Sequence, residues 1–119
     1  KYVQYDTGSA GAAAVAGEVS YYYTLDGYKN NVVTSDLSDS VEIGAGVLQA
    51  VMTDGQFGWI QIRGAATLTI ALTAGADGDP LTPTGSADGT LDVSASATDN
   101  VCAIAGDISD KEIVCTFPD

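Results

Sequence analysis

The chain has 119 residues, 45% of them hydrophobic, with 4 basic against 16 acidic side chains and a net charge of −12. This length suits a single domain, and the apolar content excludes a disordered chain. No apolar run approaches the roughly 20 residues of a membrane helix. The basic residues are also scattered, whereas phosphate binding needs them clustered. We therefore expect neither a membrane nor a nucleic acid as a partner.

The first residues are expected to lie apart from the main body. Lys1–Asp6 alternates in polarity and predicts a short strand or an extended arm. Gly8–Gly17 consists mostly of Ala and Gly and predicts a flexible link or a closely packed small-residue passage. We accordingly expect an N-terminal arm and linker over residues 1–17, and a single β domain over residues 18–119.

Val19–Leu25 is the next clear strand, with Val19, Tyr21, Tyr23 and Leu25 on one face. Alternation then places Tyr22 on the opposite face, as an interface candidate or an ordinary exposed tyrosine. Asp26-Gly27 predicts a turn toward a strand at Asn31–Thr34. After a polar loop, Val41–Thr53 begins as a strand and becomes apolar on both faces.

The most informative stretch, Gly55–Leu72, contains two alternating segments joined by small residues. In the first, Trp59, Gln61 and Arg63 share one face, and Ile60 and Ile62 share the other. We expect the Trp59 face to point outward, although a buried Trp59 with Ile60 outward is the competing arrangement. In the second segment, Leu68, Ile70 and Leu72 are expected to share the buried face of a strand.

Turn signals and short alternating runs occupy the rest of the chain. Thr73–Gly89 is the longest predicted loop, and strands are predicted at Thr90–Ser96, Asn100–Ala105 and Lys111–Phe117. On the last of these, Ile113, Cys115 and Phe117 align. Frequent turns, about seven to nine short strands and no convincing helix predict an all-β fold, either a small β-barrel or a sandwich.

The sequence lacks the usual catalytic groups. It has no His, which removes the commonest general base, and no Gly-x-Ser-x-Gly motif. We therefore expect no enzymatic activity and no cofactor. Asp77, Asp79 and Asp88 lie in one Gly-rich region and are weak calcium candidates. They do not have the spacing of an established calcium motif, and the competing interpretation makes them solvated turn residues.

The two cysteines, Cys102 and Cys115, allow several states. Two buried free thiols are the first interpretation, and a disulfide across adjacent strands is the second. Without His, the pair would be at most half of a zinc site.

Several segments taken together resemble a known family. The resemblance spans roughly Val41 to Phe117, about two-thirds of the chain, and is carried by the segments Gly44–Gln49, Gly58–Gly64, Ala74–Leu81, Asp88–Leu91, Val101–Ala105 and Glu112–Phe117. In these the chain is similar to the capsid decoration, or cement, proteins of tailed bacteriophages. The Trp-Ile-Gln-Ile strand and the Gly-Asp-Pro-Leu turn are distinctive in combination.

The resemblance implies a small β-barrel or β-tulip-like domain, often trimeric, on the outer capsid surface of the virion. There it would bind the major capsid protein and clamp neighbouring subunits together. The contact candidates are the Trp59, Gln61 and Arg63 face, Tyr22, and the arm with Tyr2 and Tyr5, for which we expect strand addition to the edge of a capsid subunit. The competing functions are a carbohydrate-binding β-module and a calcium-dependent adhesion module of a secreted or fibre protein.

Overall fold

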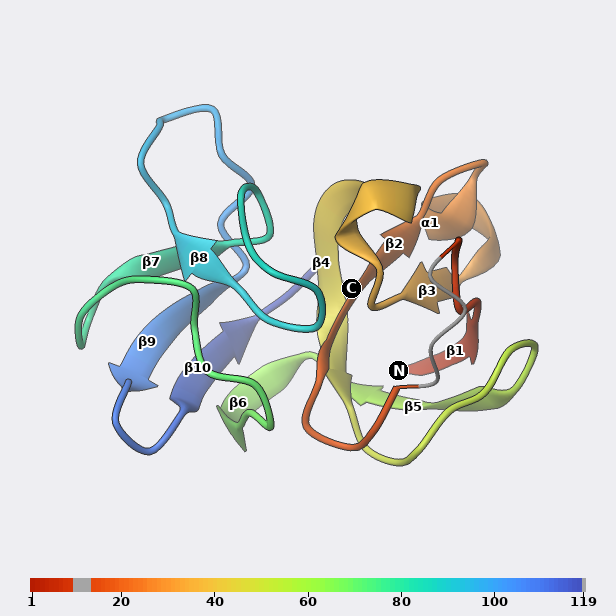
Figure 1. Cartoon of the computed structure of the whole chain (residues 1–119), viewed down its shortest axis with the longest axis horizontal. Coiled ribbons are helices and arrows are strands. Elements are labelled where there is room, and N and C mark those ends of the chain that lie inside the picture. The colour runs from red at the N-terminus through yellow and green to blue at the C-terminus, as the bar shows by residue number, and fades with distance from the viewer. Residues whose placement is uncertain (10–13, 119) are drawn as a thin grey trace.

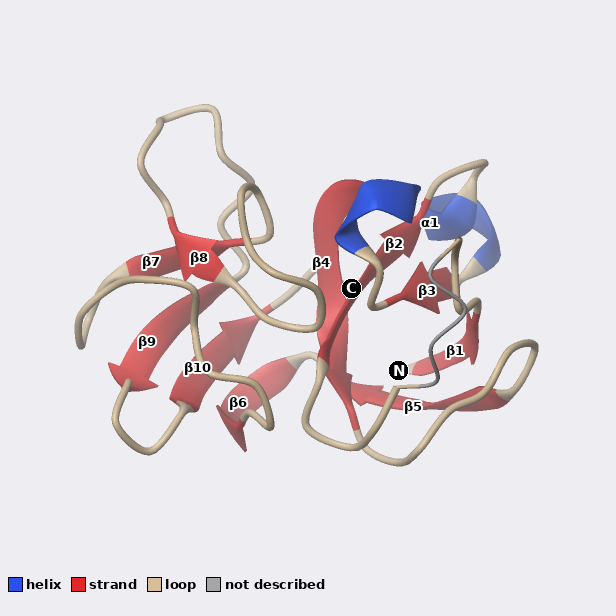
Figure 2. Ribbon diagram, viewed as in Figure 1, coloured by secondary structure: helices blue, strands red, loops and turns tan. Residues whose placement is uncertain are grey.

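The part of the chain that the structure describes is almost entirely strand. The computed structural model describes residues 1–9 and 14–118. It contains one helical turn, α1 (Gly27–Asn30), and one 3-10 turn, η1 (Leu37–Asp39) (Figure 1; Figure 2). The strands are β1 (Tyr2–Tyr5), β2 (Val19–Tyr23), β3 (Val32–Thr34), β4 (Ser40–Leu48), β5 (Phe57–Gln61), β6 (Arg63–Thr67), β7 (Pro80–Thr82), β8 (Asp92–Val93), β9 (Ala103–Asp107) and β10 (Glu112–Thr116). The all-β prediction is confirmed.

Five strands close into a barrel in the order β1-β3-β2-β4-β5, with β5 pairing back onto β1 (Figure 1). β1 is parallel to β3 and antiparallel to β5, so that Gln4 lies opposite Val32 on one side and Phe57 on the other. Because alternate side chains point inward, each strand gives the interior about half of its residues. The buried cluster inside the barrel consists of Val3, Tyr5, Ala14, Tyr22, Val33, Ala45, Leu48, Met52 and Ile60.

The second sheet has the order β6-β10-β9-β7-β8 and lies beside the barrel (Figure 1). A second buried cluster, which we call the second core, lies between this sheet and strands β2 and β4. We call β2 and β4 the shared wall, because each gives side chains to the barrel cluster and to the second core. Tyr22 belongs to the barrel cluster, whereas Val19, Tyr21 and Val47 belong to the second cluster. The second sheet and its loops contribute Ala66, Leu68, Leu81, Leu91, Cys102, Ala103, Ala105, Ile113, Cys115 and Phe117.

Small residues in β4 allow this close packing. A Cβ atom added to Gly44 would lie 2.7 Å from Sγ of Cys102 and 2.8 Å from Cε1 of Phe117. One added to Gly46 would lie 2.8 Å from the backbone oxygen of Gln61. Such contacts are too close for any larger side chain. The glycines at these positions are therefore required by the contact between β4 and its neighbours.

The shared wall also explains why the prediction for Tyr22 was wrong. Tyr21 and Tyr22 are both fully buried, although they point to opposite faces of β2. A strand covered on both sides buries consecutive side chains, and period-two alternation no longer separates inside from outside. Tyr22 is therefore a core residue, while Leu25, predicted to share a face with Tyr21, lies beyond the end of β2 and is 82% exposed.

Of the two predictions for Lys1–Asp6, the short strand is confirmed and the extended arm is wrong. β1 pairs with β3 on one side and with β5 on the other, so neither of its edges is open to another chain. Its inward residues Val3 and Tyr5 are buried, which removes Tyr5 as an interface candidate. Of the small-residue passage Gly8–Gly17, residues 10–13 lie outside the described residues, and Ala14 forms a bridge with Met52.

Two further predictions need correction in the middle of the chain. No strand forms over Leu68–Leu72, although Leu68 is buried as expected. Here the backbone N–H of Thr69 donates to the carbonyl of Gly17 instead of to a strand partner. The predicted loop Thr73–Gly89 contains β7, whose Leu81 and Thr82 are fully buried.

The open edges of the second sheet are short or covered. On β6, the Nε2 of Gln61 donates to the carbonyls of Arg63 at 2.9 Å and Ala65 at 2.8 Å. At the opposite edge, β8 has only two residues. Since the barrel has no edge at all, strand addition by another chain finds little backbone to pair with. The exposed faces of the sheets are therefore more accessible to another chain than their edges.

Candidate functional site

Three large aromatic side chains lie together on the outside of the barrel, and we call them the aromatic stripe: Tyr2, Phe57 and Trp59. They are 52%, 60% and 62% exposed. Tyr2 lies opposite Trp59 in the β1–β5 ladder, with ring centroids 5.0 Å apart and ring planes at 60°. The ring of Tyr2 is also 6.0 Å from that of Phe57 and nearly parallel to it, at 13°. Large, clustered and exposed aromatic groups of this kind are typical of interaction sites.

The strand beneath the stripe is held on both sides. β5 pairs with β1 and with β4, and its Ile60 is only 3% exposed. Between Phe57 and Trp59, Gly58 packs on Met52, where an added Cβ would lie 3.0 Å from Cε. The rings therefore project from a fixed backbone and lose little backbone freedom on binding.

A groove runs along the same outer surface next to the stripe, and we call it the barrel groove. Its volume is about 320 Å³, and it is lined by Gln4, Tyr5, Asp6, Tyr23, Leu25, Val32, Asp54 and Gly55. Gln4 joins the two features, because it lies opposite Phe57 in one ladder and opposite Val32 in the other. The stripe and the groove thus form one continuous face on β5, β1 and β3.

The barrel groove is acidic. Asp6 accepts a hydrogen bond from the backbone N–H of Gly8 at 2.8 Å, and Asp54 accepts one from that of Thr7 at 3.1 Å. The negative charge of Asp6, with smaller effects of burial and of other carboxylates that include Asp54, raises the pKa of Tyr23 above its ordinary value. A raised phenol pKa indicates a negative potential at this face.

The predicted Trp59 face is only partly reproduced. Trp59 and Tyr2 are exposed and in contact, and the arrangement with Trp59 buried and Ile60 outward is wrong. Gln61 covers the edge of β6, and Arg63 lies in β6, where its Nη1 donates to the carbonyls of Ile62 and Phe117. Gln61 therefore connects the barrel to the second sheet, whereas Arg63 contacts the residue before β6 and the residue after β10.

Sequence reasoning missed Phe57 as a member of the stripe. The signal was present, because Phe57 is two residues before Trp59 and so shares its face. Tyr2, in contrast, can be placed opposite Trp59 only when the β1–β5 pairing is known. Pairing between residues that far apart in the chain has no local signature.

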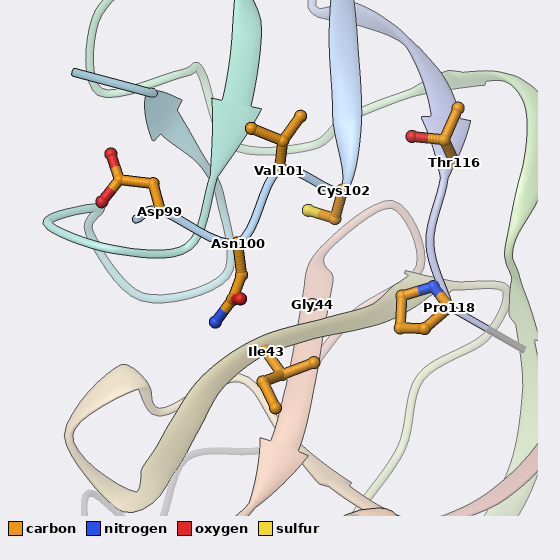
Figure 3. Close-up of a pocket in the computed structure, with 8 residues that line it drawn as sticks. All are labelled: Ile43, Gly44, Asp99, Asn100, Val101, Cys102, Thr116 and Pro118. Carbon is orange, nitrogen blue, oxygen red and sulfur yellow. The ribbon is translucent and has the colours of Figure 1, made fainter. Parts of the chain in front are cut away.

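A separate cleft of about 380 Å³ lies where β4 meets the loop before β9 and the end of the chain (Figure 3). It is lined by Ile43, Gly44, Asp99, Asn100, Val101, Cys102, Thr116 and Pro118. Burial raises the pKa of the Cys102 thiol to about 12, which keeps it protonated and weakly nucleophilic. The Asp99 carboxylate accepts backbone N–H groups of Ala95 and Ser96 in its own turn. The burial of Cys102 and the hydrogen bonds of Asp99 therefore indicate structural roles for both groups.

The calcium candidates are not brought together. Asp77 accepts from the backbone N–H of Ile108, Asp79 from that of Ala76, and Asp88 from that of Leu37. Each acid thus fixes a different turn or loop contact. Within residues 1–9 and 14–118, no group of three or more His, Cys, Asp or Glu side chains is arranged to hold a metal ion.

The two cysteines are free and buried in the second core, with Cys102 2% and Cys115 1% exposed. Burial raises the pKa of Cys115 to about 11, and burial with the nearby Cys115 raises that of Cys102. Their place in the core is that of small apolar residues.

Comparison of the chain with protein-family models, with curated proteins and with solved structures gives no match. Among the described residues, no helix has the length and apolar character needed to cross a membrane.

Proposed function

We propose that this protein is a structural cement protein on the outer surface of a phage head, where it binds the major capsid protein and stabilises the shell. The observation that carries the proposal is the aromatic stripe, a rigid exposed cluster on a body whose strand edges are closed or covered. Such a body can bind repeatedly through one face without offering an edge for uncontrolled strand pairing.

The resemblance of Val41 to Phe117 to capsid decoration proteins supports the same proposal. The chemistry of the ionisable groups agrees with a binding role. Burial raises the pKa values of the Cys102 and Cys115 thiols and keeps them protonated, and Asp77, Asp79 and Asp88 each accept a backbone hydrogen bond. A clamp needs rigid contacts and apolar area, both of which the stripe supplies.

The experiment is a binding titration of purified protein on empty, expanded phage heads, followed by sedimentation. Trp59→Ala is expected to weaken binding roughly 30-fold, the effect of losing a hot spot worth about 2 kcal/mol. Val114→Ala is the control, because Val114 is 45% exposed but lies on the second sheet. If the protein does not bind the heads at all, the proposed function is refuted.

Assembly is tested separately by light scattering on the purified protein. We propose a homotrimer, and a mass three times that of the 12.1 kDa chain is the expected result. A monomeric mass at concentrations well above those needed for head binding would refute this part of the proposal. It would leave capsid binding intact, because a monomer can also occupy a shell site.

A second candidate function is favoured by the geometry of the stripe. The nearly parallel rings of Tyr2 and Phe57 resemble the aromatic platforms of carbohydrate-binding modules, although Trp59 is tilted by 60° to Tyr2. Sugar rings stack on coplanar exposed aromatic groups, so the tilt favours a protein partner. Binding of the protein to a glycan array tests the alternative. Glycan binding that is lost in the Trp59→Ala variant would favour the carbohydrate function over the capsid function.

A further inference from the structure

Beyond the identity of the partner, the outer face of the barrel indicates what chemistry the partner surface must have. We infer that the aromatic stripe and the barrel groove together bind a basic segment of the partner protein, one that carries Arg or Lys side chains. The inference rests on the proposed function in one respect: the capsid shell is what supplies the segment.

The first argument is the continuity of aromatic and acidic groups on one face. Gln4 lines the groove and lies opposite Phe57, so that the exposed rings border a groove whose lining includes Asp6 and Asp54. Aromatic faces attract guanidinium and ammonium groups, and carboxylates accept their N–H donors. A basic side chain bound across this boundary would make both interactions.

The second argument is charge complementarity. The residues that line the barrel groove include two carboxylates and no basic side chain. Lys1 is directed elsewhere: its Nζ donates to the hydroxyl of Tyr22 at 2.5 Å and lies 5.1 Å from the centroid of that ring. The raised pKa of Tyr23 agrees with a negative potential here. Opposite potentials across an interface favour a basic partner and speed its association.

The same charge argues against a second copy of this chain as the occupant. Each copy has a net charge of −12, and joining two acidic faces would bring like charges together. A copy would also have to present a basic surface, but its basic residues are only Lys1, Lys29, Arg63 and Lys111. Contacts between copies in a trimer therefore have to use other surfaces.

The test compares two double variants on expanded phage heads in 50 mM and 500 mM NaCl. Asp6→Asn with Asp54→Asn removes two charges from the groove, and asparagine keeps an oxygen for the Gly8 and Thr7 N–H groups. Asp77→Asn with Asp110→Asn removes two charges from the second sheet as the matched control. We expect the groove variant to bind about tenfold more weakly at low salt and the control to bind within about twofold of the parent. Thermal unfolding confirms that both variants fold.

A second measurement separates this inference from the proposed function. A six-residue arginine peptide is titrated into the labelled protein, with a six-residue glutamate peptide as the control, and the Trp59 indole signal is followed by NMR. Peptide-dependent shifts without head binding would support the basic-ligand site and refute the capsid function. Head binding that is unchanged in the Asp6 and Asp54 double variant, or insensitive to salt, would overturn the inference and leave the capsid function standing. Self-association that Trp59→Ala abolishes would also overturn it, because the occupant would then be a second copy.

Discussion

Replacing Gly44 with Ala tests how tightly β4 packs against the second core. The new Cβ would lie 2.7 Å from Sγ of Cys102 and 2.8 Å from Cε1 of Phe117, side chains that are 2% and 0% exposed. The Phe117 ring cannot move into solvent, and the new Cβ would also lie 3.0 Å from Cβ of Cys102, so the strand or the core must shift, at a cost of about 1–3 kcal/mol. Replacing a strand glycine with Ala recovers about 0.5–1 kcal/mol. We expect a net loss of about 1–2 kcal/mol in the free energy of unfolding.

Urea denaturation measures this loss as a lower midpoint at an unchanged slope. Gly106→Ala is the matched control, since Gly106 is also a strand glycine without positive φ, and its added Cβ would approach nothing closer than 3.4 Å. The control should be neutral or slightly stabilising. In a double-mutant cycle, Cys102→Ala should offset part of the Gly44→Ala cost, because it removes the sulfur. Equal stability of Gly44→Ala and Gly106→Ala would refute the close packing.

Three other predictions follow from the second core. Tyr21→Phe should cost about 1–3 kcal/mol in urea denaturation, because the buried N–H of Thr90 donates to the Tyr21 hydroxyl at 3.0 Å and would lose its acceptor. The free energy of unfolding should fall between about pH 9 and pH 12. In the folded protein the thiol pKa values of Cys115 and Cys102 are about 11 and about 12, above the ordinary value of 9.0. Over this range the unfolded chain loses its thiol protons before the folded protein does, so rising pH favours the unfolded chain. Cys102→Ala should flatten this slope in urea titrations at successive pH values, and an unchanged slope would contradict the assignment. Both thiols should resist a colourimetric thiol reagent in the native protein and react fully in urea, whereas fast native labelling would show that the second core opens readily.

Local alternation predicted much of the fold where a strand has one core and one solvent face. Ile113, Cys115 and Phe117 share a buried face as predicted, and Trp59 points outward with Ile60 inward. Each of these segments has one buried and one exposed face, so the two-residue alternation of apolar and polar residues correctly separates buried from exposed side chains.

The errors arise where a strand touches two cores or where pairing is long-range. Tyr22 was misplaced because β2 is covered on both sides, and the β1 arm was misplaced because its partners, β3 and β5, are remote in sequence. β7 was missed because Pro80 and Pro83 flank a buried two-residue core, a pattern that usually indicates a loop. The acidic groove beside the aromatic stripe was likewise beyond prediction, since Asp6 and Asp54 meet only through barrel closure.

Because of the shared wall, the barrel and the second sheet, which we call the two lobes, depend on each other for folding. Neither lobe can be removed or replaced by itself, because this would expose one face of β2 and β4 to water. Both lobes should therefore lose structure in one event, and the amide hydrogens of β2 should exchange with solvent only through that event. Substitutions in the buried part of this wall also face two sets of steric requirements at once, so the residues of β2 and of Gly44–Leu48 in β4 have less freedom to vary than those of a strand with one exposed face.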